Sequence, residues 1–240
     1  MAAVAPALQF ITVPAAAKHT ATVIFVHGLG DTGHGWKPVA DMFKTEPSLT
    51  HVKWVLPHAR QRPITGNMGM TMPGWFDIKS FENFKTVEDE EGMMESVRHL
   101  TELIDVEIAS GIQPNRVILG GFSQGAAMSL LTGLTSEKLQ LAGVVSLSGW
   151  LPLKQKFKET VSSHAKSTPV FWGHGTADPL VRLEFANESI EALKSFGFNI
   201  TSGVEGAKGV SFNTYPGVAH STNLQELDDL KSWISKVLPA

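Results

Sequence analysis

One stretch of the sequence decides the fold, RVILGGFSQGAA at residues 116–127. Its first part, Arg116–Gly120, is a run of β-branched and apolar residues and predicts a buried strand. A helical pattern begins near Gln124, so the turn between strand and helix is very short. Ser123 lies in this turn, with one glycine two residues before it and another two residues after it. The stretch therefore predicts a strand that passes sharply into a helix, a unit typical of α/β proteins.

The same alternation of strands and helices extends along the chain. Most of the β-branched runs are apolar on both faces, as in a covered and largely parallel sheet. A long helical pattern from Met93 to Ile108 has apolar residues every three or four positions. The alternation predicts a doubly wound α/β fold, in which ligands bind beyond the carboxyl ends of the strands. The other predicted strands are Thr22–Val26, His51–Leu56, Ala142–Leu147, Pro169–Gly173 and Val210–Tyr215, and the other predicted helices are Trp36–Thr45, Gln124–Leu134, Val181–Phe196 and Leu224–Val237.

The length and composition fit one domain. The chain has 240 residues, and α/β folds reach about 250 residues as a single unit. No repeat or linker is visible, so we expect residues 1–240 to form one domain, with 1–19 as a peripheral N-terminal segment. The Ala-rich start lacks the basic region of a secretion signal, which predicts a cytoplasmic or nuclear protein.

Charge, hydropathy and cysteine content exclude several classes of protein. With 20 Lys and Arg against 23 Asp and Glu, the net charge is −3 and no basic cluster is present, which disfavours nucleic-acid binding. Uncharged stretches are interrupted well before about 18 residues, so no membrane-spanning helix is predicted. The sequence has no cysteine, which excludes disulfide bonds, thiolate metal sites and a cysteine nucleophile.

The glycine-rich run Gly28–Gly33 matches the G-x-G-x-x-G pattern and follows a predicted strand. A dinucleotide site would also need a helix that begins within the glycines and an acidic residue about 20 positions later. Neither feature is present, since Lys53–Leu56 contains no acid. The glycines are better explained by a turn with unusual dihedral angles.

The turn around Ser123 has the pattern of a nucleophile elbow. Such an elbow holds its serine in a strained backbone conformation, so the residues two before and two after must be small. Gly121 and Gly125 meet this need. The alternative is a glycine-rich turn with an incidental serine, because the motif alone is short.

The order of residues along the chain helps to separate these alternatives. In folds that carry the elbow, an acid and then a histidine follow in loops after later strands. Asp178 comes after the strand predicted at Pro169–Gly173, in a position that also suits a helix cap, and His220 comes after Val210–Tyr215. His174 is a rival base, but it would have to act from the same turn as the acid, so His220 is favoured.

These residue types predict acyl transfer through a covalent serine. His220 takes the proton of Ser123, and Asp178 orients the imidazole and stabilises its cationic form. The tetrahedral oxyanion needs two backbone N–H donors, one from the residue after the nucleophile and one from a loop after an early strand. Gln124 and Leu29 occupy those two positions.

Several stretches closely resemble the acyl-protein thioesterases, members of the phospholipase/carboxylesterase family of α/β hydrolases. The resemblance runs in order from about Thr20 to Leu238. It implies the α/β-hydrolase fold, a mostly parallel doubly wound sheet flanked by helices, with the catalytic residues at Ser123, Asp178 and His220. The stretches are HGLGDTGHGW at 27–36, WFD at 75–77, GGFSQG at 120–125, HGTADPLV at 174–181 and GVAH at 217–220.

This resemblance implies hydrolysis of fatty-acyl thioesters on S-acylated (palmitoylated) proteins, and of lysophospholipids or simple carboxyl esters, with no cofactor and no metal. Ala2 follows Met1 and cysteine is absent, so neither a myristoyl nor a palmitoyl anchor is expected. Contact with membranes is therefore expected to be transient, and the expected assembly is a monomer or a weak homodimer. The segment Asn199–Gly209 looks longer than is usual in the family.

A long acyl chain is expected to lie against the segment Arg62–Ile78. Its Pro and Gly residues exclude a regular helix, and methionines in an irregular loop suit a flexible alkyl chain. The alternative is a loop that folds onto its own core. The predicted acyl-binding residues are Met70, Met72, Trp75 and Phe76 on this segment, and Trp150, Leu151 and Leu180 on the opposite wall.

Two other functions remain open from the sequence. A broad carboxylesterase or lysophospholipase acting on oxyesters would use the same nucleophile and oxyanion donors. A non-catalytic receptor can arise on this fold when a catalytic residue is lost, but all three are present here.

Overall fold

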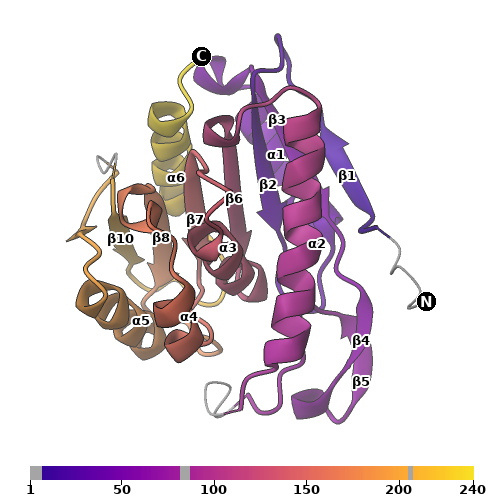
Figure 1. The fold of residues 1–240 in the computed structure, drawn as a ribbon, viewed down its shortest axis with the longest axis vertical. Coiled ribbons are helices and arrows are strands. Elements are labelled where there is room, and N and C mark those ends of the chain that lie inside the picture. The colour runs from indigo at the N-terminus through magenta and orange to yellow at the C-terminus, as the bar shows by residue number, and fades with distance from the viewer. Residues whose placement is uncertain (1–6, 82–86, 205–207) are drawn as a thin grey trace.

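The computed structural model describes residues 7–81, 87–204 and 208–240, and these contain an eight-stranded sheet in the order β1-β3-β2-β6-β7-β8-β10-β9 (Figure 1). Strand β1 pairs antiparallel with β3, and all other neighbours in this sheet are parallel. A separate antiparallel hairpin is formed by β4 and β5. The strands are β1 (Phe10–Val13), β2 (Ala21–Val26), β3 (Val52–Pro57), β4 (Gln61–Ile64), β5 (Met70–Pro73), β6 (Val117–Phe122), β7 (Gly143–Leu147), β8 (Val170–Gly175), β9 (Ile200–Thr201) and β10 (Val210–Tyr215).

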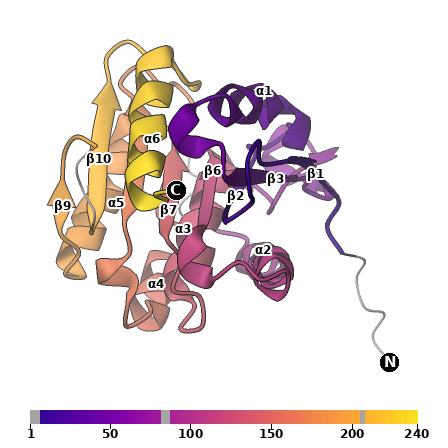
Figure 2. The same ribbon diagram turned by 90° about the horizontal axis from the view of Figure 1, so that it is seen from above.

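Helices cover both faces of the sheet. Helices α1 and α6 lie on one face, and α2, α3, α4 and α5 lie on the other (Figure 2). The helices are α1 (Gly33–Lys44), α2 (Glu90–Ala109), α3 (Gln124–Thr135), α4 (Lys154–Thr160), α5 (Leu183–Ser195) and α6 (Leu224–Val237), with single 3₁₀ turns at Pro47–Leu49, Thr65–Asn67, Pro114–Arg116 and Ala165–Ser167.

Each face of the sheet has its own hydrophobic core. On the α1 and α6 face, Phe43 and Trp233 pack over strand residues such as Trp54. On the opposite face, Leu100 of α2 and Phe157 of α4 belong to a larger core. Because both faces are covered, all six residues of β2 are buried, which explains the continuous apolar runs of the central strands.

The predicted α/β fold is confirmed, and each predicted strand and helix is present within a few residues. Strands β1, β4, β5 and β9 and helix α4, which are all short, were not expected from the sequence. The segment Arg62–Ile78, expected to be an irregular loop, instead contains most of the β4–β5 hairpin. Pro63 and Pro73 lie within these two strands, and such residues normally argue against a strand.

The N-terminal segment 1–19, expected to be peripheral, contributes β1 to the edge of the sheet, while residues 1–6 lie outside the described residues. Residues 205–207 of the long segment Asn199–Gly209 also lie outside them.

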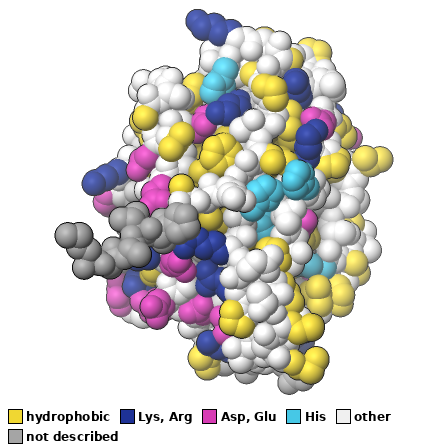
Figure 3. Space-filling model, turned by 90° about the vertical axis from the view of Figure 1, so that its right-hand side faces the viewer, with side chains coloured by type: hydrophobic (Ala, Val, Ile, Leu, Met, Phe, Trp, Pro, Cys, Tyr) yellow, Lys and Arg dark blue, Asp and Glu magenta, His cyan; other side chains and the backbone are white. Residues whose placement is uncertain are grey.

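No helix in the described ranges is long and apolar enough to span a bilayer. On the face shown in Figure 3, acidic and basic side chains are mixed rather than gathered by sign.

Candidate active site

Ser123 lies at the tight junction between β6 and α3. Its backbone has φ 56° and ψ −118°, a conformation that is costly for a residue with a Cβ. The junction is tight because β6, α3 and the end of β2 meet there. A Cβ on Gly121 would come 2.4 Å from the carbonyl carbon of Gly125, and one on Gly125 would come 2.0 Å from Val26 O. Both glycines are therefore required by the packing, as the elbow pattern predicts.

His220 and Asp178 come from loops after neighbouring strands. Strands β8 and β10 pair in parallel, so the loops that follow them emerge at the carboxyl ends of the strands, as does the turn after β6. His220 Nε2 lies 3.0 Å from Ser123 Oγ, and His220 Nδ1 lies 2.7 Å from Asp178 Oδ2. The structure thus joins serine, histidine and carboxylate in one hydrogen-bonded chain.

The two carboxylate oxygens of Asp178 have separate partners. Oδ1 accepts hydrogen bonds from the backbone amides of Leu180 and Val181, each at 2.9 Å, while Oδ2 faces His220. The Asp178 side chain is fully buried. These amides hold the carboxylate in place, so that Oδ2 accepts from Nδ1–H and leaves Nε2 free to accept the serine proton.

His174, the rival base, is buried beneath the acid. Its Nε2 donates to Val181 O at 2.7 Å, and it lies 3.8 Å from Asp178 Oδ2. Burial lowers the pKa of His174, which keeps the ring neutral. Its ring therefore braces the turn around the acid, while His220 contacts the serine.

The two predicted oxyanion donors, Leu29 and Gln124, line the same cleft as Ser123. Gln124 is the first residue of α3, and Leu29 lies in the turn after β2. This turn approaches the serine closely, since a Cβ added to Gly28 would come 3.3 Å from Ser123 Cβ. Within the described part of the chain, the amides of Leu29 and Gln124 have no hydrogen-bond acceptor. Two free N–H groups beside the serine are suited to bind a developing oxyanion.

A mainly apolar cleft opens above Ser123 and His220. Of the predicted acyl-binding residues, Trp150 and Leu180 line it, and Leu180 is 59% exposed at its mouth. Several other lining residues were not expected from the sequence, although most lie close to its motifs. The cleft is lined by Gly28, Leu29, Asp31, Ile78, Phe81, Phe122, Ser123, Gln124, Trp150, Leu180, Val181 and His220.

The other predicted acyl-binding residues lie elsewhere. Trp75, Phe76 and Leu151 are buried in the core and do not line the cleft. Met72 packs partly buried against the same core, and Met70 is 51% exposed on the hairpin. The structure therefore separates the hairpin methionines from the wall formed by Trp150 and Leu180. Among the described residues, no cluster of His, Asp and Glu has the arrangement of a metal site.

Known proteins resemble this chain over nearly its whole length. A family model for phospholipase/carboxylesterase matches residues 8–238. Acyl-protein thioesterase 1 of Cryptococcus neoformans var. neoformans is 48% identical over 236 residues, which cover 96% of this chain and 98% of the relative. Acyl-protein thioesterase 1 of Yarrowia lipolytica is 39% identical, with 96% and 98% covered.

Solved structures agree with this assignment. The crystal structure of Zea mays acyl-protein thioesterase 2 superposes with a TM-score of 0.81 at 30% identity, covering 96% of this chain and 99% of its own. Arabidopsis thaliana SOBER1 gives a TM-score of 0.81 at 34% identity, with 91% and 99% covered. The chain therefore belongs to the phospholipase/carboxylesterase family of α/β hydrolases.

Proposed function

We propose that the protein is a serine hydrolase that removes long-chain fatty-acyl groups from S-acylated proteins. The observation that carries the proposal is the hydrogen-bonded chain from Ser123 through His220 to Asp178 at the base of an apolar cleft. The names of the relatives support a thioester substrate, since they are acyl-protein thioesterases. The reaction is acyl transfer to Ser123 followed by hydrolysis.

In the first half-reaction, Ser123 Oγ attacks the thioester carbonyl while His220 Nε2 takes the serine proton. The carbonyl oxygen becomes an oxyanion, which accepts hydrogen bonds from the Leu29 and Gln124 amides. The C–S bond then breaks, and the imidazolium returns its proton to the departing cysteine sulfur. The products are the free thiol of the substrate protein and an acyl ester on Ser123.

In the second half-reaction, water attacks the acyl ester and gives a proton to His220. The same amides stabilise the second oxyanion. When the C–O bond to Ser123 breaks, His220 returns the proton to Oγ and the fatty acid leaves. Asp178 stays ionised throughout and stabilises the imidazolium in each step.

The acyl chain occupies the cleft in this proposal. Phe122 and Trp150 lie close to the serine, and Ile78, Phe81 and Leu180 complete an apolar wall. Each buried methylene is worth up to about 0.8 kcal/mol, so a longer chain gains affinity until the cleft is full. The substrate protein stays outside, and its cysteine sulfur reaches the serine at the base of the cleft.

A broad carboxylesterase or lysophospholipase is the second candidate. The family description itself names phospholipase and carboxylesterase activity, and the triad treats oxygen and sulfur leaving groups alike. For either activity we propose a cytoplasmic or nuclear protein that contacts membranes transiently and acts as a monomer or weak homodimer.

Two experiments test this proposal. A fluorophosphonate probe should label the wild type and a Ser167→Ala control, whose serine is exposed and remote from the triad, but not Ser123→Ala. Labelling that persists in Ser123→Ala would refute the assignment of the nucleophile.

The substrate class is tested by kcat/KM for acyl thioesters and matched oxyesters, from acetyl to palmitoyl, below their micellar limits. A rise of up to about fourfold per methylene toward long thioesters is the expected result. A flat or falling series with a preference for oxyesters would favour the short-chain carboxylesterase.

A further inference from the structure

One buried tryptophan outside the cleft connects the two turns that carry the proposed oxyanion donors. Trp75 is 1% exposed and lies in the segment between β5 and α2. Its indole contacts the turn after β2, and its backbone contacts the side chain of Gln124. Neither the triad nor the cleft uses this residue.

On the Leu29 side, three hydrogen bonds hold the His27 ring and the backbone carbonyls of His27 and Gly28. His27 Nδ1–H donates to Gly28 O at 2.7 Å, and Ala59 N donates to His27 Nε2 at 3.0 Å, which sets the tautomer of the ring. Burial lowers the pKa of His27, so the ring stays neutral. Gly28 C=O and Leu29 N–H belong to the same planar trans peptide and point in opposite directions. Fixing Gly28 O therefore also fixes the direction of the Leu29 N–H. Trp75 Nε1–H donates to His27 O at 2.8 Å and fixes the preceding peptide.

On the Gln124 side, the amide side chain binds the same segment twice. Gln124 Oε1 accepts from Trp75 N at 3.0 Å, and Gln124 Nε2 donates to Phe76 O at 2.9 Å. Gln124 is 1% exposed, so these bonds are shielded from water. The two bonds hold the first residue of α3, whose N–H is the second donor, against the segment that carries Trp75.

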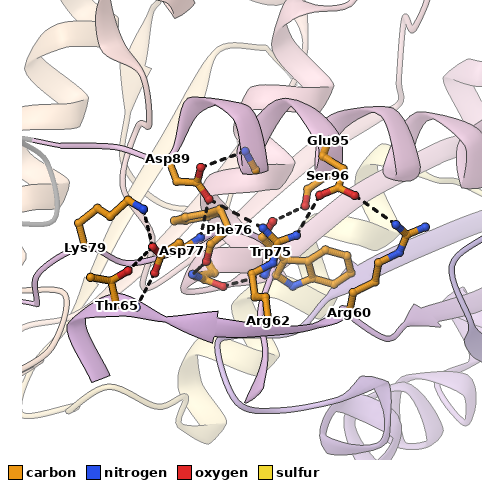
Figure 4. Close-up of polar contacts among 12 residues, drawn as sticks. Arg60, Arg62, Thr65, Trp75, Phe76, Asp77, Lys79, Asp89, Glu95 and Ser96 are labelled. Atoms are coloured by element: carbon orange, nitrogen blue, oxygen red, sulfur yellow. Dashed lines mark hydrogen bonds and ion pairs between the residues drawn. The ribbon is translucent and has the colours of Figure 1, made fainter. Parts of the chain in front are cut away.

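Helix α2 keeps this segment in place. Ser96 Oγ donates to Trp75 O, and Asp77 N donates to Asp89 Oδ2 at 2.8 Å (Figure 4). Asp89 also caps α2 by accepting from Gly92 N. The segment is therefore tied to α2, to the elbow and to the turn after β2 at once.

We propose that Trp75 is a positioning residue that sets the spacing between the Leu29 and Gln124 amides. The inference rests on the proposed function, because it concerns the oxyanion of that reaction. Misplaced donors bind the tetrahedral state less well but leave ground-state binding in the cleft unchanged. The loss should thus appear in kcat rather than in KM.

The test compares two tryptophan-to-phenylalanine variants measured with a chromogenic ester. Trp75→Phe removes the hydrogen bond to His27 O. Trp54→Phe is the matched control, because Trp54 is equally buried and its indole N–H has no partner among the described residues. We expect kcat to fall about 10- to 100-fold in Trp75→Phe with KM within threefold, and to stay near wild type in Trp54→Phe.

A trifluoromethyl ketone that carries an acyl chain gives a second readout, since its adduct on Ser123 mimics the oxyanion. Its affinity should fall by the same factor as kcat/KM in Trp75→Phe, while the affinity for the product fatty acid should not change. Equal kcat in both tryptophan variants, or a loss confined to KM, would overturn the inference.

A second variant covers the case in which Trp75→Phe does not fold. Gln124→Met keeps the backbone amide but removes both side-chain bonds to the 75–76 backbone, and the same loss of kcat is expected. Wild-type kcat in Gln124→Met would overturn the inference. Absence of Ser123-dependent ester hydrolysis in the wild type would instead refute the proposed function itself.

Discussion

The two ends of the sheet each bury a carboxylate beside an imidazole and a hydroxyl. At the carboxyl ends of the strands the set is Asp178, His220 and Ser123. Near the amino ends of β2 and β3, Glu107 accepts from Thr22 Oγ1 at 2.8 Å, and His19 Nε2 lies 2.9 Å from the same hydroxyl. Similar chemical groups therefore meet at both ends, but only one end opens to the cleft.

The direction of the hydrogen bonds distinguishes the two sets. Thr22 gives its proton to Glu107, so the His19 nitrogen that contacts Thr22 must donate and cannot act as a base. Lys53 lies 2.6 Å from Glu107 and balances its charge. At the other end the histidine donates to the carboxylate and accepts from the serine.

Backbone conformation is the second difference. Thr22 lies in the regular strand β2 and is fully buried, whereas Ser123 is held at φ 56° at the base of the cleft. A reactive set therefore needs the correct order of donors and acceptors, a nucleophile that lines the cleft and free amides beside it. The amino-end set has none of these features and stabilises the fold.

The largest expected effect comes from removing one hydroxyl at each end. Ser123→Ala should lower kcat/KM by about 10⁴-fold or more, since the other groups cannot replace the nucleophile. Thr22→Val should leave kcat/KM unchanged and lower the free energy of unfolding by about 1 kcal/mol. Ester hydrolysis and urea unfolding measure the two quantities, and a loss of activity in Thr22→Val would break the comparison.

Neutralising the carboxylates gives the next effect. Asp178→Asn should lower kcat by about 10³- to 10⁴-fold, because the amide disturbs the tautomer of His220. Glu107→Gln should keep activity but lower the free energy of unfolding by about 2 kcal/mol, since Lys53 loses its partner. Equal losses of activity in both variants would contradict the separate roles of the two carboxylates.

Glycine substitutions test the strained turn itself. Gly125→Ala should destabilise the fold by about 3 kcal/mol or more, because the new Cβ would overlap Val26 O. Gly69→Ala, at φ 72° with open space around it, should cost about 1 kcal/mol. Thermal unfolding measures both, and similar losses would show that the elbow is less tightly packed than described.

The last expected effect is one of pH and concerns Glu226, whose oxygens have no partner within the described residues. Burial, and then the nearby Asp229, raises the pKa of Glu226 to about 8 from 4.5. The contribution of Glu226 to the free energy of unfolding is therefore fully present below pH 4.5, and it is lost as the pH rises through about 8.

The free energy of unfolding should therefore fall less between pH 6 and pH 9 in Glu226→Gln than in the wild type, with a difference on the order of a few kcal/mol. Urea unfolding at both pH values measures this change, and the exposed Glu184→Gln is the control. An unchanged pH dependence in Glu226→Gln would show that this carboxyl does not control alkaline stability.

The elbow could be predicted from the sequence because its constraints are local. Gly121 and Gly125 each lie two residues from Ser123 in the chain, and one tight turn explains why both must be small. Asp178 and His220, which the structure joins to Ser123 by hydrogen bonds, were expected from the order of strands that the α/β fold sets. The central strands were predicted well because burial on both faces leaves long apolar runs.

The walls of the cleft could not be predicted in the same way. Trp75 and Phe76 are aromatic and close to the hairpin methionines, but contacts with Gln124 and Ser96 turn this segment into the core. Such long-range contacts leave no periodic signal. The hairpin was missed because its strands are short and contain proline.

The most direct test is to trap the acyl-enzyme. The protein is mixed with a palmitoyl thioester, quenched in acid within the first turnovers, digested and mapped by mass spectrometry. We expect one acyl group on the peptide that contains Ser123, and none in Ser123→Ala. Acylation of a different residue, or steady thioester turnover by Ser123→Ala, would contradict the claim that this serine is the nucleophile.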